Sequence, residues 1–153
     1  MPITDQEGIA GSDILLVDDN EQNLELLMAY LEDLGGTIRT ARDGLEALDA
    51  IKSRIPDIVL LDVMMPRMSG FQVCQRVKAD PATKDLPIVM VTALNEVGDV
   101  ERAVDSGADD FLSKPVNKVE LLTRVRSLIR LGRTQRQLRE SLAELRRLRP
   151  EGH

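Results

Sequence analysis

Histidine and cysteine, on which much enzyme chemistry depends, are almost missing from this chain of 153 residues. The single histidine is the terminal His153, which excludes Ser-His-Asp catalysis, Cys-His catalysis and histidine-ligated metals. Cys74 is the single cysteine, so a disulfide framework and a cysteine-based metal site are excluded as well. Because a lone thiol fits a reducing compartment, we expect the protein to be cytoplasmic.

Long apolar runs are also missing. No run approaches the roughly 20 residues that a membrane-spanning helix needs, and the N-terminus lacks the basic and apolar segments of a signal peptide. The glycine-rich phosphate loops GxxxxGK[ST] and GxGxxG are absent too, which weakens a nucleotide-binding interpretation. The remaining composition, 42 % hydrophobic and 30 % charged, is ordinary for a globular protein, and we expect no membrane partner.

The net charge of −6 conceals two oppositely charged parts. Residues 1–123 carry 11 Lys and Arg against 23 Asp and Glu, whereas residues 124–149 carry nine Arg against two Glu. This asymmetry indicates an acidic body and a basic tail with different roles.

Apolar runs alternate with helical patterns along the acidic part. The helix after the first strand has a stripe of Leu24, Leu27, Met28, Leu31 and Leu34. Gly35 can close that helix, and Asp43 and Ser69 can cap the next two. We predict strands at 13–17, 37–41, 57–61, 86–93 and within 108–115, and further helices at 96–106, stopped by Gly107, and from about Asn117. Strand and helix alternate five times, which predicts an α/β fold with a doubly wound, five-stranded parallel sheet of the flavodoxin-like type.

Polar side chains stand where the predicted strands end. Asp18 and Asp19 follow the first strand, Asp62 ends the third, Thr92 ends the fourth and Lys114 follows the fifth. Ligands of such sheets bind outside the carboxyl ends of the strands, so we expect these groups to converge. Crowded carboxylates need a cation, and oxygen ligands suit Mg²⁺. A carboxylate such as Asp62, at the end of the most apolar strand, can also attack phosphorus to give an acyl phosphate.

These motifs together resemble the receiver domain of two-component response regulators, of the chemotaxis-regulator-like type. The resemblance covers about residues 13–132 and implies that Asp62 accepts a phosphoryl group. The donor would be a sensor histidine kinase or a phosphotransfer protein. The resemblance rests on four motifs in this order: VDD at 17–19, LLDVMMPRMSG at 60–70, TA at 92–93 and FLSKP at 111–115.

The resemblance also implies the cofactor, Mg²⁺ or Mn²⁺, and the residues around it. Asp19, Asp62 and the backbone carbonyl of Met64 would bind the metal directly, while Asp18 would hold a metal-bound water. Lys114 would pair with a phosphoryl oxygen. None of the family's essential groups is missing from this sequence.

A conformational switch is implied as well. Thr92 would hydrogen-bond the phosphoryl group and vacate space into which the ring of Phe111 turns. Many receivers have tyrosine at that position, and phenylalanine would signal through packing alone. Lys114–Pro115 would be a cis peptide that aims the lysine into the site. The surface that changes comprises the helix at 96–106, the strand within 108–115 and the helix after Asn117.

The basic tail has heptad spacing. Leu121, Leu128, Gln135 and Leu142 share one heptad position, and Leu131, Leu138 and Leu145 share the other, which predicts a two-stranded coiled coil. Two interpretations stay open. The tail either links the receiver to a covalent output domain, or presents its arginines to nucleic acid or a membrane. The leucines and the absence of interleaved aromatics favour the linker, without direct nucleic-acid contact. Gly132 weakens the helix by about 1 kcal/mol and is predicted to mark a hinge.

We therefore expect a lead at 1–12 that is disordered, a receiver at 13–132, a coiled-coil-like extension at 133–150 and a tag remnant at 151–153. Homodimerisation would use either the C-terminal helix or the switching surface. The favoured function is a signalling module that catalyses only its own phosphotransfer and dephosphorylation. The alternatives are a Mg²⁺-dependent phosphohydrolase with an aspartate nucleophile, and a constitutive dimerisation scaffold. The hydrolase would need a carboxylate two residues after the nucleophile, where the sequence has Met64.

Overall fold

The computed structural model describes residues 11–93 and 97–148. Strands and helices alternate along these residues, as the apolar runs predict. The elements in chain order are β1 (Asp13–Val17), α2 (Glu21–Leu31), the 3-10 turn η1 (Glu32–Leu34), β2 (Thr37–Ala41), α3 (Gly44–Ser53), β3 (Ile58–Asp62), α4 (Gly70–Ala79), β4 (Ile88–Thr92), α5 (Val97–Asp105), β5 (Asp110–Ser113) and α6 (Lys118–Leu148).

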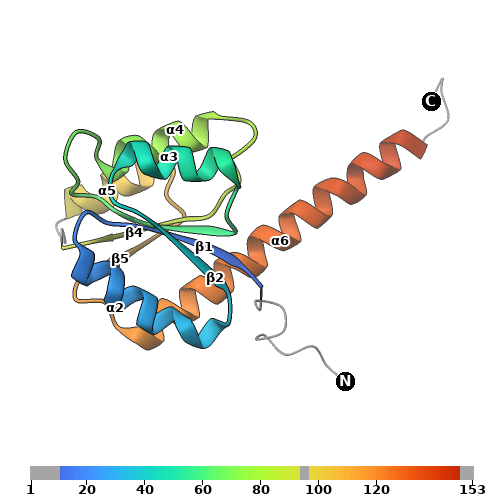
Figure 1. Ribbon diagram of the computed structural model, residues 1–153. Helices are drawn as coiled ribbons and strands as arrows, with labels where there is room; N and C mark the ends of the chain where they lie inside the picture. The colour runs from blue at the N-terminus through green and yellow to red at the C-terminus, as the bar shows by residue number, and fades with distance from the viewer. Residues whose placement is uncertain (1–10, 94–96, 149–153) are drawn as a thin grey trace.

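The five strands form one parallel sheet in the order β2-β1-β3-β4-β5, which confirms the predicted doubly wound fold. Figure 1 shows α2 and α6 on one face of the sheet and α3, α4 and α5 on the other. Each face has its own apolar core, and every residue of the central strand β3 is buried. The strand order reverses between β1 and β3, so the ends of these two strands are where such a fold binds ligands.

Side-chain caps set the starts of the helices. Asp43 caps α3 by accepting the backbone N–H of Glu46, and Ser69 and Gln72 form a reciprocal capping box at α4. Gly35 ends η1 with a left-handed φ of 71°. The helix starts at Asp43 and Ser69 and the closure at Gly35 were all predicted from the sequence, and they are confirmed.

Several local predictions were wrong, among them the bounds of the fourth strand, which runs from Ile88 to Thr92 instead of from 86 to 93. Met28 is 37 % exposed, because the buried side of α2 is narrower than the predicted stripe. The third strand begins at Ile58 instead of Asp57, whose carboxylate accepts a hydrogen bond from the backbone N–H of Asp13. That contact holds Asp57 just before the strand, and Asp62 is the last residue of the strand.

The C-terminal helix α6 runs through Gly132 without a break, so the predicted hinge is wrong. A Cβ atom at Gly132 would lie 3.2 Å from Cγ of Pro87, and glycine therefore serves the close approach of the helix to the loop before β4. Every residue from 134 to 148 is exposed. No helix in the described ranges is long and apolar enough to span a membrane.

Candidate functional site

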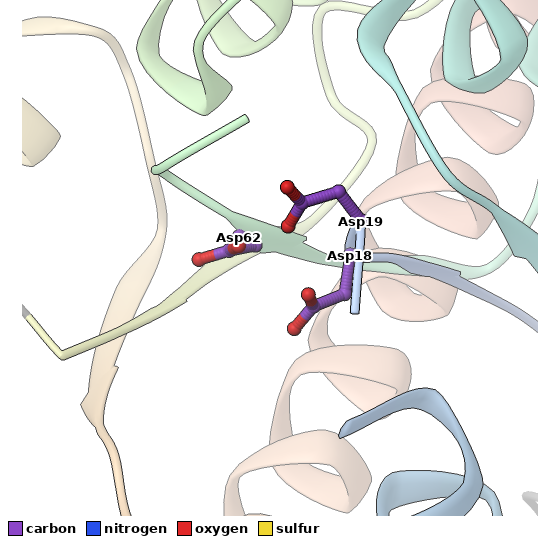
Figure 2. A group of neighbouring side chains, drawn as sticks. All are labelled: Asp18, Asp19 and Asp62. Atoms are coloured by element: carbon purple, nitrogen blue, oxygen red, sulfur yellow. The ribbon is translucent and has the colours of Figure 1, made fainter. Parts of the chain in front are cut away.

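Three carboxylates meet at the carboxyl edge of the sheet. Asp18 and Asp19 directly follow β1, and Asp62 is the last residue of β3, which pairs with β1. Figure 2 shows the three side chains gathered at this edge, and one oxygen of each lies within 4.8 Å of the others. The structure thus brings together the three acidic residues that the strand ends predicted.

A lysine joins two of these carboxylates. The ammonium nitrogen of Lys114 lies 3.1 Å from Oδ2 of Asp18 and 3.5 Å from Oδ1 of Asp62. Asp18 and Asp62 are only 2 % and 5 % exposed, whereas Asp19 is exposed. The second oxygen of Asp18 accepts a hydrogen bond from the backbone N–H of Asn20 at 2.9 Å. The single positive charge of Lys114 is therefore shared by the buried carboxylates of Asp18 and Asp62, while the Asp19 carboxylate faces solvent.

The pKa of Asp62 reflects its burial first and this charge imbalance second. Burial, followed by the negative charge of Asp18, raises the pKa of Asp62 from 3.8 to about 6, although Lys114 and a backbone hydrogen bond from Met64 both oppose the shift. The ionised form of Asp62 is thus disfavoured, and an additional cation at the edge would restore it.

The backbone fixes the lysine beside the fourth strand. The N–H of Lys114 donates to the carbonyl oxygen of Thr92 at 2.8 Å, and the Lys114–Pro115 peptide is cis, as the resemblance implied. Thr92 ends β4 and is fully buried. The acidic residues, the lysine and the threonine hence lie at the ends of four different elements along one edge.

Residues 14–126 match the model of the response regulator receiver domain. The chain belongs to this family. Response regulator PleD from Caulobacter vibrioides is 47 % identical over 135 residues, which are 88 % of this chain and 30 % of PleD. The transcriptional regulator RpaA from Synechocystis is 42 % identical over 117 residues, 76 % of this chain and 48 % of RpaA. The receiver therefore spans less than half the length of these curated relatives.

Solved receiver structures share the fold. The chemotaxis protein CheY4 of Vibrio cholerae superposes with a TM-score of 0.73 at 31 % identity, covering 78 % of this chain and 99 % of that one. The receiver domain of a Pseudomonas aeruginosa sensor histidine kinase, which has a magnesium ion coordinated in its active-site cleft, gives a TM-score of 0.73 at 31 % identity. That match covers 78 % of this chain and 98 % of the Pseudomonas chain. Receiver domains bind Mg²⁺ in their active site, and this chain has an acidic cluster at the carboxyl edge of its sheet.

The remaining predicted site residues flank the cluster. Met64 has a side chain that is 63 % exposed, and its backbone N–H donates to Asp62. Phe111 lies on β5 beside Met90 of β4, half-buried against the core that α3, α4 and α5 cover. The metal-ligand role of the Met64 carbonyl and the switch role of Phe111 stay predictions.

Sequence reasoning assigned Gly70 only to a turn, yet this residue lies against the end of β3. A Cβ atom at Gly70 would lie 2.3 Å from the backbone oxygen of Asp62, and the N–H of Gly70 donates to the carbonyl of Val63 at 3.0 Å. Glycine lets the start of α4 pack directly against the end of β3. In the sequence, Ser69 and Gly70 before an apolar helix indicate only a helix cap. The close approach of Gly70 to Asp62 becomes visible only in the folded structure.

Proposed function

We propose that this receiver is the phosphoacceptor of a two-component phosphorelay, with Asp62 as the acceptor. The main support is the position of Asp62: a buried carboxylate at the end of the central strand, 3.5 Å from an ammonium group and beside two further carboxylates. Family membership gives the class of donor, which is a phosphohistidine of a sensor kinase or of a phosphotransfer protein.

In the proposed transfer, a carboxylate oxygen of Asp62 bonds to phosphorus as the bond from phosphorus to the donor's imidazole nitrogen breaks. The imidazole leaves with the bonding electron pair and takes a proton from solvent. Lys114 offers its ammonium group to the phosphoryl oxygens, because it already reaches the Asp62 carboxylate. The hydroxyl of Thr92 supplies a further hydrogen bond to the phosphoryl group. In dephosphorylation, water attacks phosphorus while the bond from phosphorus to the Asp62 oxygen breaks, which releases inorganic phosphate and restores the carboxylate.

The acidic cluster fits a hard divalent cation. Its donors are all carboxylate oxygens, and one lysine leaves the three negative charges incompletely balanced. Asp19 and Asp62, with the carbonyl of Met64, would hold Mg²⁺ or Mn²⁺ directly, and Asp18 would hold it through water. When bound, the ion would neutralise carboxylate and phosphoryl oxygens.

The proposed signal is a change of the surface formed by α5, β5 and α6. Thr92 ends β4, and Phe111 stands on the neighbouring strand β5, which is part of this surface. Movement of Thr92 toward the phosphoryl group would let the ring of Phe111, now half-buried, turn inward. Because phenylalanine has no hydroxyl, this change would act through packing alone.

A groove beside the acceptor gives the donor protein a place to dock. The groove, of about 350 Å³, runs between α2 and the segment after β5, and Lys114 lies on its wall. Leu26 on its rim is 46 % exposed. An apolar partner surface seated here would lie next to the ammonium group and close to Asp62. We further propose that a covalent output domain reads the signal, because the relatives extend well beyond the matched region.

An intact-mass time course with acetyl phosphate and Mg²⁺ tests the proposal. We expect one phosphoryl adduct that decays over time and is absent from Asp62→Asn, while the surface control Glu25→Gln behaves like wild type. An adduct that survives Asp62→Asn would refute the assignment of the acceptor. Fast multiple turnover of small phosphate esters would instead favour the hydrolase, and a dimer fraction unchanged by beryllofluoride would favour the scaffold.

A further inference from the structure

The last helix carries an exposed apolar seam. The seam consists of Leu131, Leu138, Leu142 and Leu145, which are between 44 % and 64 % exposed. Their spacing of seven, four and three residues places them on one stripe of a helix with 3.6 residues per turn. A continuous leucine stripe of this kind is unusual on a surface and is typical of a helix that binds another helix.

The seam faces away from the receiver. Val125, Ile129 and Gly132 are buried on the side of α6 that packs against the sheet. At about 100° per residue, the centre of that buried side lies roughly 130° around the helix from the centre of the seam. Figure 1 shows the second half of α6 projecting beyond the sheet. The core of the same chain therefore leaves the seam open to another molecule.

Three arginines on the receiver side of α6 fix this orientation. We call Arg133, Arg136 and Arg139 the arginine clamp. Arg133 donates to Oγ of Ser12 at 2.7 Å, and Arg136 pairs with Asp57 at 3.0 Å. Arg139 pairs with Oδ2 of Asp85 at 2.7 Å. Exposed ion pairs of this kind contribute little to stability. Their effect is to direct the helix.

We propose that the seam binds the seam of a second copy of this chain, in a parallel and in-register two-stranded coiled coil. The proposal assigns to one surface the homodimerisation that the sequence predicts. Leu131, Leu138 and Leu145 occupy the d positions, and Leu142 and Gln135 the a positions. A single polar residue at an a position specifies register. The two Gln135 side chains face each other only when the helices are parallel and aligned.

The charged positions beside the seam select the same direction. Arg139 and Arg146 occupy e positions, whereas Thr134 and Ser141 occupy g positions. In a parallel pair, e positions face g positions, so each arginine meets a hydroxyl side chain. In an antiparallel pair, e positions face each other, and arginine would meet arginine. Like charges at that distance repel, which disfavours the antiparallel arrangement.

The seam is short, since Leu131 and Leu145 are only about 21 Å apart along the helix. Isolated helices of this length are marginal in water, and the pair should form in a concentration-dependent manner. A second contact between the attached receivers would strengthen it by raising the effective concentration of the two seams. Phosphorylation of Asp62 would provide such a contact if it changes the surface formed by α5, β5 and α6.

Cysteine cross-linking in the full chain tests direction and register together. Leu131→Cys and Leu145→Cys are each oxidised alone and then as an equimolar mixture. Wild type, whose only cysteine is the buried Cys74, and Glu140→Cys, on the far side of the helix, are the controls. We expect each seam variant alone to form a disulfide dimer at least tenfold faster than either control. Disulfide dimers that form only when Leu131→Cys and Leu145→Cys are mixed would show antiparallel helices and overturn the proposal. Glu140→Cys that cross-links as fast as the seam variants would overturn it as well.

Sedimentation equilibrium of Leu138→Lys gives the second measurement. We expect its dimer dissociation constant to rise at least tenfold, with unchanged helix content and unchanged labelling of Asp62 by acetyl phosphate. A dimer that keeps the wild-type dissociation constant would place the contact elsewhere and overturn the proposal. Loss of labelling in wild type would instead refute the proposed function, and the cross-linking pattern would still report on the seam.

Discussion

Replacing Asp62 by asparagine should stabilise the metal-free protein at neutral pH. Burial and the charge of Asp18 raise the pKa of Asp62 to about 6, so ionising this carboxylate costs free energy in the folded protein. Asparagine has nearly the same size and carries no charge. It also keeps an oxygen that can accept the backbone hydrogen bond from Met64. The substitution therefore removes the unfavourable charge and leaves the packing nearly intact.

The magnitude follows from the difference between the two pKa values. Below pH 3.8 the carboxyl group of Asp62 is protonated in both the folded and the unfolded state, and its burial has no electrostatic cost. As the pH rises toward about 6, the unfolded state ionises first and stability is lost. Above that pH the full cost is about 3 kcal/mol, at about 1.4 kcal/mol per pH unit. The Asp62→Asn variant should gain this amount at about pH 7.5 and almost nothing at about pH 4.

Urea unfolding with EDTA across this pH range measures the effect, with the exposed Glu25→Gln as the matched control. Added Mg²⁺ should then narrow the difference in unfolding free energy between Asp62→Asn and wild type. Binding of the ion to the wild-type site stabilises the folded protein by about 2.7 kcal/mol when the ion is present at a hundred times its dissociation constant. A variant that is no more stable than wild type at neutral pH would refute the reasoning. So would a gain of the same size at every pH.

Three further predictions concern single residues. Lys114→Gln should slow labelling by acetyl phosphate about 100-fold, by removing the charge that meets the phosphoryl group; an unchanged intact-mass time course would contradict this. Gly70→Ala should lower the free energy of unfolding in urea by about 1–3 kcal/mol, since its Cβ would overlap the backbone at the end of β3. The control is Gly98→Ala on α5, where a Cβ atom would meet open space, and it should be neutral or stabilising by up to about 1 kcal/mol. An equal loss of stability in both variants would contradict the overlap at Gly70. Arg136→Gln should speed amide hydrogen exchange in α6 beyond Gly132 and leave exchange in the sheet unchanged. Exchange rates in α6 that equal those of wild type would argue against the arginine clamp.

The sheet and its site were predictable because the relevant signals are local. The strands β1, β3 and β4 are apolar runs that end in, or are directly followed by, a polar residue. Asp43 and Ser69 mark helix starts through hydrogen bonds within the next turn. The parallel order then forces Asp18 and Asp62 to the same edge. The sequence alone therefore placed the acidic cluster.

Contacts between distant parts of the chain were not predictable. Asp57 and Asp85 lie far from the arginines of α6 in the sequence, and no periodic pattern links them. Gly132 looked like a weak point because its propensity is poor, and only the position of Pro87 gives the reason for a glycine there. The sharing of Lys114 between two carboxylates likewise depends on distances that the sequence does not contain.

Locating the phosphoryl group tests the central claim most directly. After incubation with acetyl phosphate and Mg²⁺, borohydride reduces an aspartyl phosphate to homoserine, and peptide mass mapping identifies the residue. We predict homoserine at position 62 and at no other aspartate. Conversion at Asp18 or Asp19, or no conversion in protein that carries the adduct, would contradict the assignment of Asp62 as the acceptor.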